Sequence, residues 1–444
     1  MTRAERFERD LPDLLADLVS PAPPEDLADA LSAMASVRQR PAWTFPLRWL
    51  PGRLEISIAP RMSWRLVGLL AIVAIVLAAM VIGALLAGSR RQLPPPFGPA
   101  ANGLLIYDAD GDIFTADPVT GATHRIVSGP DIDTRPMWSR DGTRFVFERT
   151  RADARPMGQL IVAGARGDHL VVASTEPLLH LRTYGFSPDG RSVIATATVG
   201  FTESIVVAPS DGSGPPRVLD LGGNVVIRGD LDPGPAYRPP DGDEILFMAQ
   251  RSDDSPGIYA VDLSTGDVRT IVRPRDPIYL FDPTWSPDGD RVAYGSFRSS
   301  DNCTARIHLI DADGSHDRRV DLRTDTQCDG LGHVWSNDGS RLVYSRSRSR
   351  LGDLNWAVVP VDGSSSGVEI PCPLGYTSCW SRWEWAPNDS MLVGVIAGGR
   401  VVPSFADRGA LTPEADLMVD PRTGVATPIP WTTTTGLSWQ RTAP

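Results

Sequence analysis

The pattern that decides the fold reads Trp285-Ser286-Pro287-Asp288-Gly289: an aromatic residue, a serine, a variable residue and then Asp-Gly. It recurs in three further strict copies and two relaxed ones, and a lone aromatic closes the series. The aromatic residues are Trp138, Phe186, Tyr237, Trp285, Trp335, Trp385 and Trp439, with successive spacings of 48, 51, 48, 50, 50 and 54. A period near fifty built from strand-type segments predicts an all-β chain with small sheets arranged radially, a β-propeller.

Each copy of the motif predicts a hairpin. Proline presets φ at the variable position, aspartate bonds its own backbone, and glycine accepts a positive φ. An alternating strand follows, as in Arg291-Val292-Ala293-Tyr294. The sixth copy has Asp389 in place of the glycine, which is tolerable because aspartate enters the left-handed region more readily than most residues. We expect the aromatic residues to pack between neighbouring sheets, and a role in facing a ligand is the less favoured reading.

The length of the repeat region predicts the number of sheets. Residues 103–440 comprise 338 residues, and 338 divided by 7 is about 48, which favours a seven-bladed propeller. The first unit, which begins at Leu104-Leu105-Ile106-Tyr107, lacks an aromatic-led strand, and Gly436-Leu437-Ser438-Trp439-Gln440 supplies one at the far end. We predict that these two ends pair, because pairing removes two open sheet edges.

The motif resembles the TolB-type propeller repeat of bacterial periplasmic and surface proteins, whose signature is W-S-P-D-G followed by two short strands. The resemblance extends over roughly residues 103–440. It implies a propeller, and such propellers serve as binding modules, as sensor domains and as non-catalytic halves of peptidases. Function has to be argued from the site, because one fold hosts many functions.

A transmembrane helix is predicted within residues 64–88. The stretch Leu66–Gly88 has 23 residues without a charge, and as a helix it would be about 34 Å long, against a bilayer core of roughly 30 Å. A cytoplasmic helical segment, residues 1–62, precedes it, and a Pro-rich linker, residues 89–102, follows. More arginines precede the helix than follow it, which places the N-terminus in the cytoplasm and the propeller outside. These flanking residues are Arg48, Arg53, Arg61 and Arg65 before the helix and Arg90 and Arg91 after it.

All four cysteines of the chain lie in the predicted propeller. An even number on one side of a membrane favours disulfides in an oxidising compartment; metal ligation and free thiols are the alternatives. No CxxC or HxxxH pattern accompanies them. The pairing that closes the shortest loops joins Cys303 to Cys328 and Cys372 to Cys379.

Candidate catalytic residues are few. Gly363-Ser364-Ser365-Ser366-Gly367 matches G-x-S-x-G but lies where other repeats have a turn, so we expect no catalysis from Ser365. The stretch Asp108–Asp112 is interpreted as a hairpin turn rather than a calcium loop, since the order of an EF-hand is absent. We predict no catalytic residue, no cofactor and no metal site. The formal charge of −11 disfavours nucleic acid as a partner.

The first fifty residues predict a partner in the cytoplasm. Residues 4–19 and 25–37 are two short amphipathic helices, too small to be stable alone. The architecture resembles bacterial single-pass sensors, anti-sigma factors among them, although residues 1–65 lack the histidine and cysteine of the zinc motif in one such class. A sigma factor is the leading candidate partner; anchoring to the membrane by Trp43 and Trp49 is the competing explanation.

These observations favour a membrane-anchored recognition protein whose propeller binds a protein, peptide or glycan and signals inward. On this reading the chain is not an enzyme. The alternative is an extracytoplasmic enzyme, a glycan lyase or hydrolase, with its active site in the propeller channel. Carboxylates, histidine and arginine along the channel would favour the enzyme, and an apolar channel would favour binding.

Overall fold

The computed structural model describes residues 98–443 apart from short gaps. The gaps are residues 152, 154–155, 175–176, 223–224, 228–233, 252–255, 274–277, 299–305, 321–327, 330–331, 348–353, 371–379, 398–415 and 432. The chain divides into two units, Met1–Arg90 and Arg91–Pro444, and every described residue belongs to the second. No helix in this described part is long and apolar enough to cross a membrane. The predicted segments 1–62 and 64–88, and most of the linker 89–102, lie outside it.

The described residues are all-β, and their strands form six hydrogen-bonded sheets. The first sheet pairs β3 (Thr123–Val127), β2 (Asp112–Ala116), β1 (Ala101–Ala109) and β30 (Leu437–Thr442). The second contains β4 (Ile132–Trp138), β5 (Arg144–Thr150), β6 (Met157–Gly164) and β7 (Val171–Val172). It continues with β8 (Leu178–Phe186), β9 (Ser192–Val199), β10 (Thr202–Pro209) and β11 (Arg217–Val218).

The other four sheets follow in chain order. The third contains β12 (Val225–Ile227), β13 (Ala236–Tyr237), β14 (Glu244–Arg251), β15 (Gly257–Asp262) and β16 (Val268–Val272), and the fourth β17 (Ile278–Trp285), β18 (Arg291–Arg298), β19 (Arg306–Asp311) and β20 (Arg318–Arg319). The fifth contains β21 (Cys328–Asp329), β22 (Val334–Trp335), β23 (Arg341–Ser347), β24 (Leu354–Pro360) and β25 (Val368–Ile370). The sixth contains β26 (Trp380–Trp385), β27 (Leu392–Ala397), β28 (Leu417–Val419) and β29 (Ala426–Pro428).

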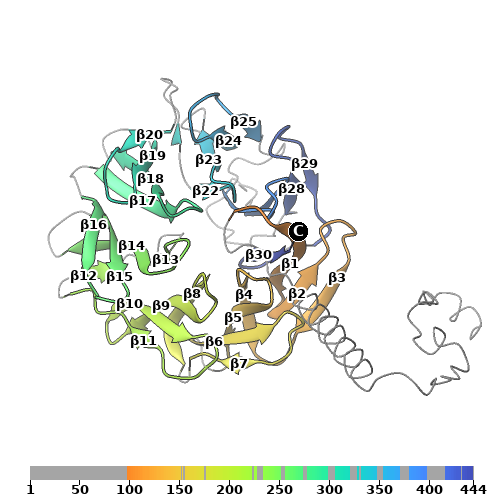
Figure 1. Cartoon of the computed structure of the whole chain (residues 1–444). Coiled ribbons are helices and arrows are strands. Elements are labelled where there is room, and N and C mark those ends of the chain that lie inside the picture. The colour runs from red at the N-terminus through yellow and green to blue at the C-terminus, as the bar shows by residue number, and fades with distance from the viewer. Residues whose placement is uncertain are drawn as a thin grey trace, which may run out of the picture. The chain divides into compact units, whose positions relative to one another are not determined.

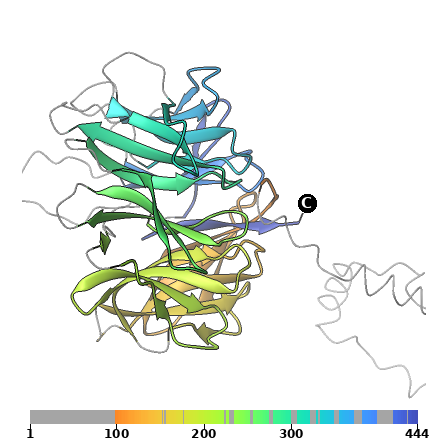
Figure 2. The same cartoon turned by 60° about the vertical axis from the view of Figure 1, so that its left-hand side comes forward.

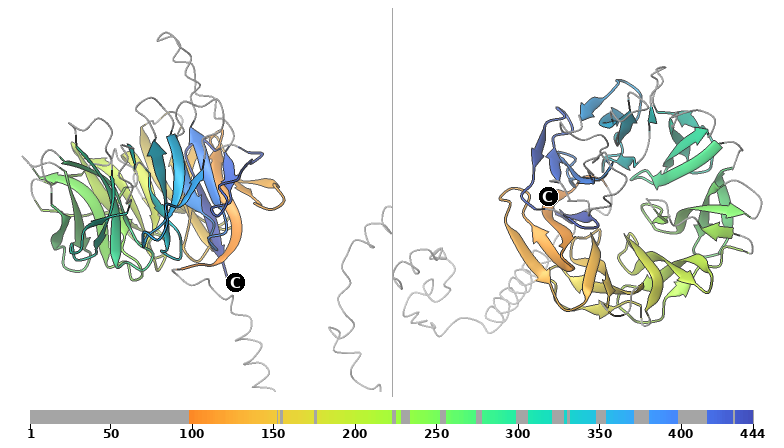
Figure 3. Two further views of the ribbon diagram at one scale, coloured as in Figure 1. Left: turned by 90° about the horizontal axis from the view of Figure 1, so that it is seen from above. Right: turned by 180° about the vertical axis from the view of Figure 1, so that it is seen from behind.

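Within the unit 91–444 the sheets follow one another around a central space, with β4, β8, β13 and β22 on its inner side (Figure 1). The turned view shows the sheets stacked side by side (Figure 2), and the view from behind shows the same ring (Figure 3). The expected propeller fold is therefore confirmed. The count of seven blades stays a prediction, because the second sheet contains two runs of strands joined where Met157 pairs with Leu179.

The predicted pairing of the two ends is confirmed. Strand β30 runs antiparallel to β1, and Trp439 lies opposite Leu105. The indole N–H of Trp439 donates to the carbonyl of Gly103 at 3.2 Å, which ties the last aromatic of the series to the first sheet. The last strand of the chain thus completes the sheet that the first strands begin.

The motif turns form as predicted. In the first copy the N–H of Gly142 donates to the carbonyl of Ser139 at 2.9 Å, and the hydroxyl of Ser139 donates to Asp141 at 2.6 Å. Gly142 has a φ of 64°, and Asp389, at the glycine position of the sixth copy, has a φ of 57°. The stretch Asp108–Asp112 is a hairpin turn, since Ala109 pairs with Asp112.

Six of the seven motif aromatics are buried between sheets, as expected, and Phe186 is partly buried. Arginines of one sheet cover the aromatic rings of the next: the Arg291 guanidinium lies 5.6 Å from the centre of the Trp335 ring, and that of Arg341 lies 4.8 Å from the Trp385 ring. Such a contact stabilises by about 0.5–2 kcal/mol. The motif therefore holds neighbouring sheets together as well as making the turn.

Candidate functional site

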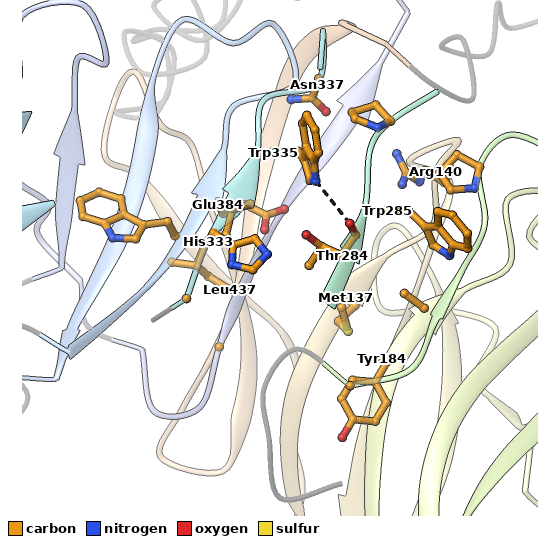
Figure 4. A pocket seen from close by; sticks show the side chains of 18 of the residues that line it. Met137, Arg140, Tyr184, Thr284, Trp285, His333, Trp335, Asn337, Glu384 and Leu437 are labelled. Carbon is orange, nitrogen blue, oxygen red and sulfur yellow. Dashed lines mark hydrogen bonds between the residues drawn. The ribbon is translucent and has the colours of Figure 1, made fainter. Parts of the chain in front are cut away.

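A cavity of about 440 Å³ lies at the centre of the ring, a size typical of small-molecule sites. Every sheet contributes to its lining from its innermost strand. These contributions include Met137, Tyr184, Ala236, Trp285, Trp335, Glu384 and Leu437. Figure 4 shows several of these side chains together. Because the last strand pairs with the first sheet, Met137 and Leu437, which are 300 positions apart, both line this cavity.

Among the described residues that line this cavity, Glu384 alone has a carboxylate. It lies in β26 next to Trp385, and its Oε1 accepts a hydrogen bond from the N–H of Trp439 at 3.4 Å. Burial raises the pKa of Glu384 to about 7, although that hydrogen bond and the positive charge of Arg140 act in the opposite direction. A carboxyl group with a pKa near 7 suits a general acid or base at neutral pH.

Arg140 is the cation whose charge acts on the carboxylate of Glu384. It occupies the variable position of the first motif turn and lines the cavity. Burial and the charge of Arg441 lower the pKa of Arg140 to about 10, and the charge of Glu384 raises it. The guanidinium is therefore charged at neutral pH, and it lines the same cavity as the carboxyl of Glu384.

His333 is a neutral imidazole in the wall of the cavity. Its side chain is 1% exposed, and burial lowers its pKa to about 4, although the backbone of Ala293 acts in the opposite direction. Neither ring nitrogen meets the geometry of a hydrogen bond with any described residue.

Asn337 has a structural part in the same wall. Its amide nitrogen donates to the carbonyl of Ala386 at 3.0 Å and to Asp389 at 2.9 Å, and its amide oxygen accepts from Arg441 at 2.9 Å. The side chain is thus held by two residues of the sixth motif turn and by Arg441 in β30. Asn337 shapes the cavity and holds Arg441 in place.

The rest of the lining is largely apolar. The indoles of Trp285, Trp335 and Trp383 contribute to it, together with Met137 and Leu437. The first two are motif aromatics, so the interpretation of these residues as core is confirmed by their burial, while they also border the cavity. Apolar walls with a few placed polar groups are typical of ligand sites.

A second cavity of about 680 Å³ is lined by residues of the first two sheets, among them Asp108 and Glu148. Both are buried, and Glu148 Oε1 accepts a hydrogen bond from the N–H of Thr183 at 2.6 Å. Burial raises the pKa of Glu148 to about 7. In the part of the chain that the structure describes, no group of three or more His, Cys, Asp or Glu side chains could hold a metal ion.

The residues singled out from the sequence lie elsewhere. Ser365 is exposed in the turn between β24 and β25, where its hydroxyl accepts from the N–H of Gly367 at 3.4 Å. Cys303, Cys372 and Cys379 lie outside the described residues. Cys328 pairs through its backbone with Ser347, so the predicted disulfides stay predictions.

The repeat did contain a signal for the site residues that sequence reasoning missed. The variable position of the motif is proline in Phe186-Ser187-Pro188 and Trp285-Ser286-Pro287 but arginine at Arg140. The residue before the motif aromatic is uncharged in the other repeats and acidic at Glu384. Departures from a repeat at positions that face the channel therefore mark the candidate site.

No protein-family model and no curated protein matches this chain. Among solved structures, an oligogalacturonate lyase in complex with manganese matches with a TM-score of 0.53 and 16% identity, over 74% of this chain and 84% of that chain. A prolyl endopeptidase matches with a TM-score of 0.52 and 13% identity, over 76% of this chain and 51% of that chain. TolB from Acinetobacter baumannii matches with a TM-score of 0.44 and 16% identity, over 78% of this chain and 68% of that chain. At these identities the likeness shows the fold.

The expectation that the chain is not an enzyme is wrong. That expectation rested on the absence of a hydrolase domain and of a recognisable motif, yet solved structures that share the fold over about three quarters of the chain are enzymes. The lyase is matched over 84% of its own length. A propeller of this kind does not exclude catalysis, and the channel here contains ionisable groups suited to it.

Proposed function

We propose that this chain is an enzyme that cleaves an acidic glycan by elimination, with its active site in the central cavity. The observation that carries the proposal is that Glu384 and Arg140 line the same cavity, where burial raises the pKa of Glu384 to about 7. Raised carboxyl pKa values beside a cation in a cavity are characteristic of catalytic sites.

The charge of the lining supports an anionic substrate. Arg135 and Arg140 both line the cavity, whereas Glu384 is the single carboxylate among the described lining residues. A glycosidase of the usual kind needs two carboxyl groups about 5–10 Å apart. One carboxyl with two arginines fits elimination from a uronic acid better, because elimination needs one base and a cation for the substrate carboxylate.

The step follows from these two residues. Arg140 binds the carboxylate of the uronate and stabilises the negative charge that grows on it in the transition state. Glu384 removes the proton from the carbon next to that carboxylate. The electron pair forms a double bond to the neighbouring carbon, and the bond from that carbon to the glycosidic oxygen breaks. The departing oxygen then takes the proton back from Glu384, which returns to its carboxylate form.

We also infer that the eight-stranded sheet comprises two blades, β4–β7 and β8–β11, which makes seven blades around the cavity. The support is that β4–β7 and β8–β11 are joined by only a short pairing between β6 and β8. In that pairing Met157 lies opposite Leu179 and Gly158 lies opposite Leu178. We propose from the sequence that the propeller is extracytoplasmic and that Leu66–Gly88 anchors it in a membrane. An inward signal through residues 1–50 to a protein such as a sigma factor is a second proposal on the same basis.

The test compares one polymer with and without its charge. The purified full chain in mild detergent is incubated with polygalacturonate and with the same polymer after reduction of its carboxyl groups to alcohols. We expect products with a carbon–carbon double bond, detected by ultraviolet absorbance and mass, from the acidic polymer alone. Products that have gained a water molecule would support the hydrolase instead. Absence of cleavage of the acidic polymer would contradict the proposal.

A further inference from the structure

The first described residues of the chain belong to the wall of the central cavity. The entry segment, residues 98–102, contains the first two residues of β1, and Gly98 lines the cavity. The backbone N–H of Ala100 donates to the carbonyl of Pro387 in the sixth motif turn at 2.8 Å, and Ala100 is 5% exposed. The end of the predicted Pro-rich linker is therefore built into the ring.

The entry segment is also attached through its last two residues. The N–H of Asn388, in the sixth motif turn, donates to the side-chain oxygen of Asn102 at 3.1 Å. The hydroxyl of Thr442, the last residue of β30, donates to the carbonyl of Ala101 at 3.1 Å. Figure 3 shows the orange beginning of β1 and the C-terminus on the same side of the ring. The entry segment therefore lies on the side of the ring where the motif turns lie.

Arg441 in β30 joins the entry segment to the opposite part of the cavity wall. Its guanidinium donates through Nη2 to the carbonyl of Gly98 at 2.5 Å and through Nη1 to the side-chain oxygen of Asn337 at 2.9 Å. Gly98 and Asn337 both line the central cavity. Arg441 is 7% exposed, so water has little access to these hydrogen bonds. One buried side chain thus holds two lining residues that are far apart in the sequence.

Two departures from the repeat support this arrangement. Asn337 occupies the variable position of the fifth motif, where the fourth has Pro287, and Asp389 replaces the glycine of the sixth. Asp389 accepts from the N–H of Asn337 at 2.7 Å through Oδ1 and from the N–H of Asp338 at 2.8 Å through Oδ2. Side chains of proline and glycine make no such contacts. The residues that hold Arg441 in place are therefore those that depart from the pattern.

Arg441 is also linked to the residues of the proposed reaction. A cavity of about 300 Å³ that Arg441 lines shares Arg140 and Glu384 with the central cavity. Burial is the main cause that lowers the pKa of Arg140, and the charge of Arg441 acts in the same direction. The position of the entry segment and the electrostatics of the site thus depend on the same side chain.

We propose that Arg441 is a positioning residue that latches the entry segment into the cavity wall and so keeps the cavity ready to bind its ligand. The proposal rests on the proposed function for the identity of the probe, trigalacturonate. Loss of a hydrogen bond to a charged group corresponds to about 10- to 100-fold in the population of the latched state. Because a ligand binds the competent fraction of the protein, its affinity falls with that fraction. Arg441 acts through Gly98 and Asn337 rather than by contact with the ligand.

The first measurement is amide hydrogen exchange of the peptide that contains Ala100, in the full chain. The amide of Ala100 is hydrogen-bonded and buried, so it should exchange slowly in the wild type. Arg441→Lys keeps the positive charge, but its single nitrogen cannot replace the fork of the guanidinium. We expect exchange at Ala100 to become about tenfold faster or more. Arg318→Lys is the matched control and should change nothing, because Arg318 donates to the carbonyl of Val361 at 2.9 Å but does not line the central cavity.

The second measurement is the affinity for trigalacturonate, titrated by calorimetry into the full chain carrying Glu384→Gln, which prevents turnover. Arg441→Lys in this background should weaken binding about tenfold. By reciprocity, saturating trimer should slow the exchange at Ala100 in the chain that retains Arg441.

A second pair of variants changes the entry segment itself. Gly98 has a φ of 79° and nothing within 4 Å of where a Cβ would lie, so Gly98→Ala meets no clash but disfavours the latched backbone by about 5- to 30-fold. It should also speed exchange at Ala100 and weaken binding. Gly266→Ala is its control, because Gly266 has a φ of 80°, equally open surroundings and no place in the cavity wall. If Arg441→Lys does not fold, this pair decides by the same criteria.

The outcomes separate the latch from the proposed reaction. Unchanged exchange at Ala100 in Arg441→Lys, or faster exchange with unchanged affinity, would overturn the latch. Faster exchange and weaker binding, in a protein whose wild type never cleaves the trimer, would support the latch and contradict elimination. Cleavage by the wild type with unchanged affinity in Arg441→Lys would do the reverse. If the chain with Arg441 intact does not bind the trimer, both proposals fail.

Discussion

Gly289, the glycine of one motif turn, meets two requirements at once. Gly289 has a φ of 75°, and a Cβ at this position would run into the carbonyl of Pro239 in the preceding sheet. Gly266, in the turn between β15 and β16, has a φ of 80° but has nothing within 4 Å of where its Cβ would lie. The first glycine is needed for conformation and for the close approach of two sheets, whereas the second is needed for conformation alone.

Replacing these two glycines by alanine should separate the two requirements. Both substitutions should lose the roughly 1–2 kcal/mol that the left-handed backbone costs. Gly289→Ala should lose clearly more, because the neighbouring sheet has to move away. Urea unfolding of each full-length variant measures the free energies of unfolding. Equal losses would contradict the close approach at Gly289.

At the level of elements, β30 is the strand that closes the ring. It pairs with β1, and Trp439 is buried in the same cluster as Leu105 and Tyr107. Without β30 the inner edge of β1 would be unpaired and these side chains would be exposed. An open sheet edge and lost burial both destabilise the fold and favour aggregation.

Deletion of residues 437–444 should therefore lower the thermal unfolding midpoint strongly. The loss should exceed the roughly 3–5 kcal/mol that truncation of a single buried tryptophan costs. Deletion of residues 443–444 alone is the control and should leave the midpoint unchanged, since β30 ends at Thr442. A midpoint that survives loss of the whole strand would show that the ring is not closed by β30.

The repeat made the elements predictable, because turn chemistry is local. Asp389 in the left-handed region and the pairing of Trp439 with the first sheet followed from the motif and its spacing. The site was less accessible to this reasoning. Glu384 and Arg140 are 244 residues apart in the sequence, and they line the same cavity only because the sheets are arranged in a ring. The bulge between Thr134 and Met137 contains Pro136, a residue that within strands is confined mainly to edges and bulges.

At the scale of the whole molecule, three carboxyl groups with raised pKa values link stability to pH. Burial raises the pKa of Glu148, Glu384 and Asp416 to about 7. Their ordinary values are near 4, so between about pH 4 and pH 7 the folded chain holds protons that the unfolded chain releases. The free energy of unfolding should thus fall as the pH rises through this window and level off above it.

Asp416→Asn should remove part of this dependence. The carboxyl of Asp416 is buried, and its Oδ2 accepts from the N–H of Thr433 at 3.0 Å, a bond that an amide oxygen can also accept. The variant should gain roughly 1–3 kcal/mol relative to wild type at pH 8 and little at pH 5. Chemical unfolding at the two pH values measures this, with the exposed Asp267→Asn as control. A gain of the same size at both would contradict a buried, protonated Asp416.

The central claim is that Glu384 transfers the proton in an elimination reaction, and one rate comparison tests it. The initial rate at which trigalacturonate gains a double bond is measured for wild type, Glu384→Gln and Glu203→Gln at pH 7. Glu203 lies in β10, away from the cavity, and makes the same chemical change a matched control. We predict a loss of about 100-fold or more for Glu384→Gln, the range of a general base, and a wild-type rate for Glu203→Gln. Equal rates in all three would contradict the account.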